Sequence, residues 1–261
     1  MTRSPRAPLA PLAPNASLRW DVVRRELPHR RARVLEIGCG QGGFGSRIAA
    51  RHDYTAVEID AASWAVADAR VRAVDPGARV LHGSVSALGP TETFDVVCAF
   101  EVLEHLEDDA GALAEWAARV RPGGVLLLSV PAWPARFGPW DTLAGHFRRY
   151  EPAALAGLLR GAGLVDAHVR VYGAPLGFLL EAVRDRTVAA AGRHGPTASD
   201  SMTERTSGSG RKFQPSTRLT GTVIAVGTWP FRLLQRAFPR SGTGLVARAR
   251  RPQSSPEEES P

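Results

Sequence analysis

The chain has 261 residues, enough for one domain with appendages, and its hydrophobic fraction of 44% is ample for a buried core. The net charge of +7 would suit a nucleic-acid partner, but Lys212 is the only lysine and the arginines are spread along the whole chain. Aromatic residues are not interleaved with the basic clusters, as a single-strand binder would require. The composition therefore gives no indication of a nucleic-acid partner.

The first residues and the cysteines point to an intracellular protein. Residues 1–16 are rich in proline, alanine and arginine without a continuous apolar core, which predicts a disordered segment and no signal peptide. Ser17 is then expected to cap a helix that runs to about Leu27. Cys39 and Cys98 belong to no zinc or C-x-x-C pattern. Reduced thiols and a cytoplasmic location are expected.

A glycine-rich loop follows the first predicted strand. The apolar run at 33–37 gives way to five glycines within residues 38–45, and apolar residues then recur at helical spacing. This pattern predicts a buried strand, a glycine turn and a helix, the first half of a nucleotide-binding βαβ unit. Glycines let a ligand approach the backbone and permit a positive φ, and the helix offers free N–H groups at its N-terminus.

The loop fits two classes of cofactor. Gly38, Gly40 and Gly43 match the dinucleotide fingerprint G-x-G-x-x-G. Glu36 begins a second pattern, E-x-G-x-G-x-G, which also takes in Gly42. An acid beside the loop would repel a pyrophosphate but would attract the ammonium and sulfonium of S-adenosylmethionine. The second pattern resembles motif I of the class I S-adenosylmethionine-dependent methyltransferases, and an NAD(P)-dependent oxidoreductase is the alternative.

The next two strands add cofactor candidates. The second predicted strand, 54–59, ends at Glu58, about twenty residues beyond the loop, where nucleotide-binding α/β proteins place a ribose-binding carboxylate. Asp60 is expected to cap the following helix. In the resembling family, the turn after the third strand lies over the adenine, often with an acid. Ser84 stands at that place here, followed by Val85, so an adenine contact would come from the hydroxyl or from backbone groups.

The fourth and fifth strands strengthen the resemblance. Residues 94–100 are a continuous apolar run, as expected for a central parallel strand covered on both faces. The run opens into EVLEHLEDD, and Glu101–Leu106 resembles the same methyltransferases, in particular the ubiquinone-biosynthesis O-methyltransferase type. The tight turn R-P-G-G at 121–124 and the apolar strand 125–130 match the family as well.

The resemblance covers about residues 30–172 and the last strand, and it implies a Rossmann-like α/β fold. That fold has a seven-stranded, mostly parallel sheet with helices on both faces, and its seventh strand is antiparallel. S-Adenosyl-L-methionine is the implied cofactor. The donor-binding residues expected from the motifs and the resemblance are Glu36, Gly38, Cys39, Gly40, Gly42, Glu58, Ile59, Ser84, Val85, Phe100 and Glu101.

The loop after the fifth strand should border the acceptor, because ligands of open α/β sheets bind beyond the carboxyl ends of the strands. Its aromatic residues either form an apolar acceptor wall or pack on one another; they are Trp133, Phe137, Trp140 and Phe147. Residues 141–150 resemble a segment found in a subgroup of bacterial methyltransferases. Within this segment, Arg148 and Arg149 either clamp an anionic acceptor or are solvated.

Methyl transfer requires few catalytic groups from the protein. The donor is already activated, so the site must supply proximity, alignment and exclusion of water, and no metal or nucleophile triad is expected. A hydroxyl acceptor also needs a base to take its proton. His146 is the first candidate for this base and His105 the second, and the alternative for each is a structural role.

The pattern changes after residue 172. Two apolar helices are expected over 173–191 and 217–238, and we interpret them as lid helices over the acceptor site, with peripheral membrane contact as the alternative. The predicted organisation is a core at 17–172, a helical insertion between strands six and seven at 173–241 with a disordered loop at 192–216, a last core strand at 242–250 and a disordered acidic tail at 251–261.

The function predicted from these observations is transfer of a methyl group from S-adenosyl-L-methionine to a small-molecule acceptor, with O-methylation favoured, in the cytoplasm. A non-catalytic module that binds the donor is a further alternative. The sequence gives no indication of the oligomeric state.

Overall fold

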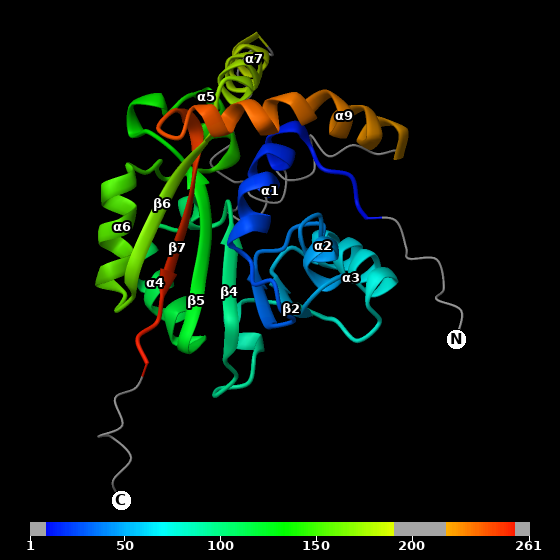
Figure 1. Ribbon diagram of the computed structural model, residues 1–261, viewed down its shortest axis with the longest axis vertical. Coiled ribbons are helices and arrows are strands. Elements are labelled where there is room, and N and C mark those ends of the chain that lie inside the picture. The colour runs from blue at the N-terminus through cyan, green and yellow to red at the C-terminus, as the bar shows by residue number, and fades with distance from the viewer. Residues whose placement is uncertain (1–8, 191–217, 254–261) are drawn as a thin grey trace, which may run out of the picture.

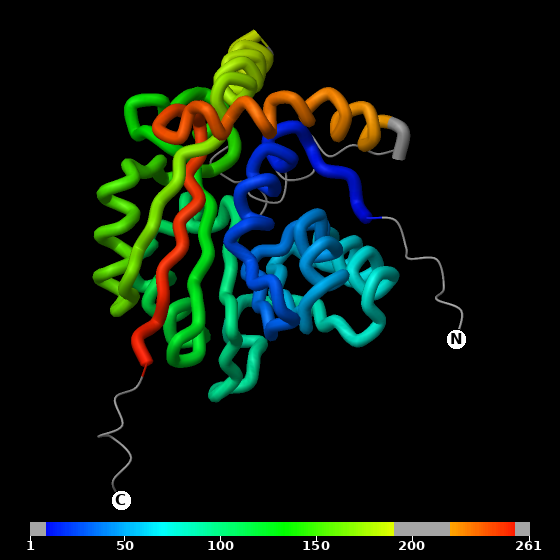
Figure 2. The backbone as a smooth tube through the Cα atoms, in the orientation of Figure 1, coloured from blue at the N-terminus to red at the C-terminus, as the bar shows by residue number. Residues whose placement is uncertain are grey.

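A computed structural model describes residues 9–190 and 218–253. These residues build one seven-stranded sheet, made of β1 (Arg33–Ile37), β2 (Asp53–Glu58), β3 (Arg79–His82), β4 (Phe94–Phe100), β5 (Val120–Pro131), β6 (Val165–Gly173) and β7 (Gly242–Arg250). The strand order is β3-β2-β1-β4-β5-β7-β6 (Figure 1). The first five strands are parallel, whereas β7 runs antiparallel between β5 and β6, as Figure 2 shows for the red strand. The predicted fold class is confirmed.

Helices cover both faces of the sheet. One face carries α1 (Pro14–Glu26), α2 (Gly45–Ala49) and α3 (Ala61–Val74), and the other carries α4 (Asp109–Ala118) and α6 (Pro152–Gly161) (Figure 1). Two separate apolar cores result, one on each side. The parallel strands are buried on both faces, which is why they read as continuous apolar runs. In β4, for example, every residue except Asp95 is buried.

The N-terminal segment departs from the prediction. Helix α1 begins at Pro14 and Ser17 is buried within its first turns, so Ser17 is not the cap. Proline is favoured at the first helical position because its fixed φ is already helical and its missing N–H costs no hydrogen bond. Residues 9–13 are also described, and Leu12 packs against the apolar core to which α1 contributes. The expected disorder is therefore corrected for residues 9–16, and residues 1–8 lie outside the described chain.

The R-P-G-G segment is also placed differently. It lies inside β5 as an irregularity, and the pairing register with β4 shifts between Phe94 and Val96. Gly123 has a φ of +74°, and a Cβ on Gly124 would lie 2.8 Å from the carbonyl oxygen of Asp95. The two glycines thus let the strand pass close to its neighbour without a separate turn.

The insertion between β6 and β7 contains α7 (Leu176–Ala190) and α9 (Arg218–Leu234), with the predicted loop 192–216 outside the described residues. In Figure 1, α9 lies across one end of the sheet and α7 stands above it. Short helical segments complete the chain: η1 (Val85–Ala87), η2 (Leu103–His105), η3 (Pro134–Arg136), α5 (Pro139–Ala144) and η4 (Gln235–Ala237). Among the described helices, none combines the length and apolar character needed to cross a bilayer.

Candidate active site

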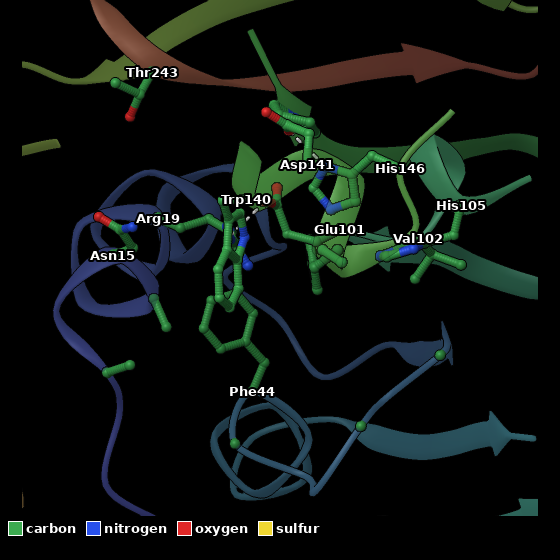
Figure 3. Close-up of a pocket in the computed structure, with 18 of the residues that line it drawn as sticks. Asn15, Arg19, Phe44, Glu101, Val102, His105, Trp140, Asp141, His146 and Thr243 are labelled. Atoms are coloured by element: carbon green, nitrogen blue, oxygen red, sulfur yellow. Dashed lines mark hydrogen bonds and ion pairs between the residues drawn. The ribbon is translucent and has the colours of Figure 1, made fainter. Parts of the chain in front are cut away.

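A cavity of about 900 Å³ opens beyond the carboxyl ends of β1, β2 and β4. Its walls come from the glycine loop, α1, the segment after β4, α5 and α7. Figure 3 shows Asn15 and Arg19 of α1 on one side of the cavity and His105 and His146 on the other. The size and position are those of a small-molecule site in an open α/β sheet.

The glycine loop needs its glycines for two reasons. Gly38 and Gly40 have φ values of +68° and +52°, which side chains rarely adopt. A Cβ on Gly38 would lie 2.7 Å from Cγ2 of Val102, whereas a Cβ on Gly40 would meet nothing within 4 Å. Gly40 therefore faces open space that a ligand can occupy. Gly42 has another task, since its Cβ would lie 3.1 Å from Cα of Ala67, so this glycine lets α3 pack against the loop.

Glu58 braces this loop from the end of β2. Its carboxylate accepts hydrogen bonds from the backbone N–H of Gly40 at 2.7 Å and of Asp60 at 2.9 Å. Asp60 caps α3, as predicted, by accepting from the N–H of Ser63. The neighbouring Ile59 is 52% exposed and lies on the cavity wall, where it presents an apolar surface. An acid followed by an exposed apolar side chain suits a ribose with its base.

Glu36 lies beneath the loop and is only 3% exposed. Burial raises the pKa of its carboxyl group to about 8, and repulsion from Glu58 adds to this rise. The hydrogen bond donated by the Tyr54 hydroxyl opposes it. Glu36 therefore carries a proton at neutral pH when the cavity holds no cation. The attraction expected from the sequence develops only when a cationic ligand stabilises the ionised form.

Replacing Glu36 with glutamine should raise the free energy of unfolding at neutral and alkaline pH. The folded carboxyl group keeps its proton up to about pH 8, whereas the unfolded group ionises at about pH 4.3. The contribution of the Glu36 carboxyl group to the free energy of unfolding is fully present below about pH 4.3. It is lost as pH rises towards 8, at up to about 1.4 kcal/mol per pH unit. Denaturant unfolding of both proteins should show a difference that widens between about pH 5 and pH 8. A constant difference would mean that Glu36 is ionised in the folded chain.

Residues from α1 complete the cavity near Glu101. Arg19 pairs with Glu101 at 3.0 Å and donates to the Tyr172 hydroxyl at 2.9 Å, while Ser129 donates to the other Glu101 oxygen at 3.1 Å. The sequence prediction missed Arg19 and Asn15, which both line the cavity. Their i, i+4 spacing would have placed them on one helix face if the helix had been predicted to begin at Pro14.

The predicted donor residues divide into two groups. The structure brings Glu36, Gly38, Cys39, Gly40, Glu58, Ile59, Phe100 and Glu101 together on the cavity wall. Gly42, Ser84 and Val85 lie outside the lining. Ser84 caps η1 and shares a hydrogen bond with the Ser86 hydroxyl at 2.8 Å, so its side chain is engaged locally.

The predicted aromatic wall is formed in part. Trp140 and Phe147 line the cavity. Trp133 instead donates to the Gly242 carbonyl at 2.8 Å, and Phe137 is an exposed side chain away from the cavity. The wall continues onto α7, which contributes Leu180, Val183, Arg184 and Thr187. Helix α7 thus has the position of a lid, whereas α9 packs along α1 and contributes no lining residue.

A buried ionic network holds His146. Nδ1 of His146 lies 2.7 Å from Oδ1 of Asp141. The guanidinium of Arg149 donates bidentate hydrogen bonds to the same carboxylate. Arg149 also donates to Glu181 of α7 at 2.9 Å. Burial would raise the pKa of Asp141, but hydrogen bonds from His146, Arg149 and the Gly138 N–H hold it well below its ordinary value. Asp141 is therefore an anion that orients the imidazole.

The arginine pair expected to clamp an acceptor or to be solvated is engaged in ion pairs with acids of the chain, and Arg149 also lines the cavity. The side chain of Arg149 is 1% exposed within the network just described. Arg148 pairs with Asp109 at 2.7 Å and donates to the Glu107 carbonyl at 2.7 Å. Both guanidinium groups fasten the acceptor loop to other elements, because each finds an acid brought near by tertiary packing.

His105 lies against His146, with ring centroids 4.7 Å apart and planes at 84°. Burial and repulsion from His146 together lower the pKa of His105 to about 3. A hydrogen bond to the backbone of Gly145 opposes this shift. His105 is therefore neutral. Beside it, burial raises the pKa of Glu104 well above its ordinary value.

Comparisons with known proteins agree with this geometry. A family model described as a methyltransferase domain matches residues 14–169. The chain is 38% identical over 152 residues to a probable S-adenosylmethionine-dependent methyltransferase of Mycolicibacterium smegmatis. The aligned region covers 56% of this chain and 57% of that protein's length. It is 35% identical over 166 residues to the ubiquinone biosynthesis O-methyltransferase of Xanthomonas axonopodis, covering 56% of this chain and 68% of that protein.

A solved structure shares the fold. Phosphoethanolamine N-methyltransferase 2 of Haemonchus contortus, in complex with S-adenosyl-L-methionine, matches with a TM-score of 0.57 at 17% identity, over 94% of this chain and 54% of that chain.

The fold and the cavity define an α/β protein that binds a nucleoside-bearing cofactor beyond the carboxyl ends of its strands. Since the family model spans more than half of the 261 residues, the chain belongs to the class I S-adenosylmethionine-dependent methyltransferases. The predicted family, its enzymatic character and its cofactor, S-adenosyl-L-methionine, are confirmed. The residues fit this cofactor, because Gly40 leaves a cradle that a side chain would fill and Glu36 is a buried acid beneath it.

Proposed function

We propose that this chain transfers a methyl group from S-adenosyl-L-methionine to a hydroxyl group of a small-molecule acceptor. The observation that carries the proposal is the imidazole of His146, which lines the same cavity as the glycine loop and is held by Asp141. An imidazole beside an acceptor hydroxyl can take its proton as the oxygen is methylated. The similarity to a ubiquinone biosynthesis O-methyltransferase supports oxygen as the target.

The donor would lie over the glycine loop. Gly38 and Gly40 leave the backbone accessible, Glu58 faces the ribose, and Ile59 offers an apolar surface to the adenine. Glu36 ionises beneath the cationic groups. When bound, S-adenosyl-L-methionine supplies a methyl group already activated by its sulfonium, so the chain has mainly to align the acceptor and exclude water.

The acceptor would lie under α7. Trp140 and Phe147 form one apolar side of this region, and Leu180 and Val183 of α7 form another. Such walls suit an acceptor with an apolar body that carries a hydroxyl group. In the transfer, the acceptor oxygen forms the new C–O bond while the C–S bond breaks and its electron pair stays on sulfur. The acceptor proton goes to His146, with His105 as the second candidate.

A screen with labelled donor across phenols, sugars, lipid-linked hydroxyl compounds and matched amines tests the proposal. Label is expected on oxygen, with phenols or lipid-linked compounds as the best acceptors. Replacing His146 with glutamine should lower kcat by about 100-fold or more, the usual contribution of a general base, and leave S-adenosylhomocysteine binding intact. Transfer to amines alone, or no transfer to any acceptor with the donor bound, would contradict the proposal.

We also propose that α9 touches membrane surfaces. Val223, Val226, Trp229 and Leu233 recur at helical spacing on one face and are all exposed. Co-sedimentation with anionic vesicles should show binding that weakens as salt rises. Replacing Trp229 with serine should reduce it by about 10- to 150-fold, since a buried aromatic side chain contributes about 1.5–3 kcal/mol. Equal sedimentation of both proteins would exclude α9 as the contact.

A further inference from the structure

One buried acid beside the acceptor region has no role in the proposed transfer. Glu104 is 0% exposed, and neither of its carboxylate oxygens has a hydrogen-bond partner among the residues that the structure describes. Buried carboxylates are normally hydrogen-bonded, paired with a cation or bound to a metal. An unsatisfied carboxylate in this position therefore calls for a partner that the described part of the chain does not supply.

Two imidazoles face this carboxylate. Glu104, His105 and His146 each offer one ligand atom, and these atoms lie within 4.8 Å of one another. Ligands around a single ion at about 2.0–2.2 Å are about 3–4 Å apart, so small side-chain rotations close the set. Two imidazoles and one carboxylate on one side of an ion leave positions for other ligands.

The backbone and the outer hydrogen bonds hold the three side chains together. The N–H of Phe147 donates to the Glu104 carbonyl at 2.8 Å, which fixes the loop of His146 beside η2. Nδ1 of His146 is engaged by Asp141, so Nε2 is the nitrogen that can ligate. The ring of His105 is hydrogen-bonded to the backbone of Gly145. Such partners orient the imidazoles of known metal sites.

We propose that Glu104, His105 and His146 bind one divalent transition-metal cation at the acceptor side of the cavity. Imidazole and carboxylate together favour ions such as Zn²⁺, Mn²⁺ or Co²⁺. His105 and His146 line the cavity and Glu104 lies next to their ligand atoms, so an acceptor oxygen can reach the positions of the ion that face the cavity. With a cation on Nε2, His146 is a ligand and cannot take the acceptor proton, so it acts as the proposed base only in the metal-free chain. This inference goes beyond the proposed transfer and requires no turnover.

The test uses the full chain without a histidine tag, stripped with a chelator and titrated with Co²⁺ and Zn²⁺ by calorimetry and, for Co²⁺, by visible absorption. Wild type should bind one equivalent and develop a ligand-field band. Glu104→Gln and His146→Gln should each weaken binding by about 100-fold or more, beyond what loss of an outer hydrogen-bond partner costs. His168→Gln is the matched control, because His168 is an exposed imidazole on β6; it should bind like wild type.

Calorimetric binding of S-adenosylhomocysteine and the melting temperature check that each variant is folded. If Glu104→Gln does not fold, His146→Gln and His105→Gln answer the question. The inference is overturned if wild type binds neither ion, or if a folded variant of this cluster binds as tightly as wild type. An acceptor screen that fails while the metal binds stoichiometrically would contradict only the proposed function.

Discussion

Replacing Gly40 with leucine should weaken S-adenosylhomocysteine binding by about 100-fold or more, equivalent to about 2.8 kcal/mol, while the chain stays folded. A Cβ at this position meets nothing within 4 Å, so the side chain begins in open space and not in packed protein. It would occupy the space that the bound ligand needs against the backbone. Isothermal titration calorimetry measures the affinity, and thermal unfolding measures the stability.

Gly163 supplies the matched control for this variant. It has a φ of +78°, its Cβ would also meet nothing within 4 Å, and it lies outside the cavity between α6 and β6. Leucine at either position carries the same left-handed backbone strain of about 1–2 kcal/mol. Gly163→Leu should therefore lose similar stability and keep full affinity. Wild-type affinity in Gly40→Leu would show that the ligand does not approach the loop.

Replacing Asp141 with asparagine should lower the free energy of unfolding by about 3 kcal/mol. The carboxylate is buried with Arg149 and His146, so among the described residues the substitution leaves Glu181 to balance the buried guanidinium. The melting temperature should fall by about 6–12 °C for a chain of this size. His146 also loses the anion that orients it, so kcat should fall while donor affinity changes little.

The control is Asp166→Asn on the protein surface. Asp166 pairs with Arg250 at 2.7 Å, but both side chains are exposed, and such pairs contribute about 0–1 kcal/mol. The pKa of Asp141 is held low in the folded state, so its contribution is present above the unfolded pKa of about 3.9 and is lost as pH falls below that value. The two variants should therefore differ clearly at neutral pH. Equal effects at that pH would mean that the buried network adds no more stability than a surface pair.

Several parts of the cofactor site could be predicted because they depend on short stretches of chain. The glycine loop and Glu58 lie within about twenty residues of one another, and the alternation of apolar runs with glycine turns fixes where each strand ends. Since parallel strands bring their carboxyl ends to one edge, the residues just after β1, β2 and β4 had to meet there. The start of α1 was misplaced because a proline-rich segment was expected to be disordered, although proline also begins helices.

The acceptor side could not be predicted in the same way. Arg149 was expected to clamp a ligand or to be solvated, but its partner Glu181 lies 32 residues later on α7, and only the folding of α7 over the loop makes the pair. The contacts of Arg19 with Glu101 and of His146 with His105 likewise join distant segments.

By itself, the sequence determined the sheet, the glycine cradle and the family, because these follow from local spacing of apolar residues and glycines. Only the tertiary structure decided which histidines, acids and arginines face one another across the cavity. The physical reason is that burial and charge pairing depend on which surfaces pack together, and local periodicity carries no information about partners on remote elements.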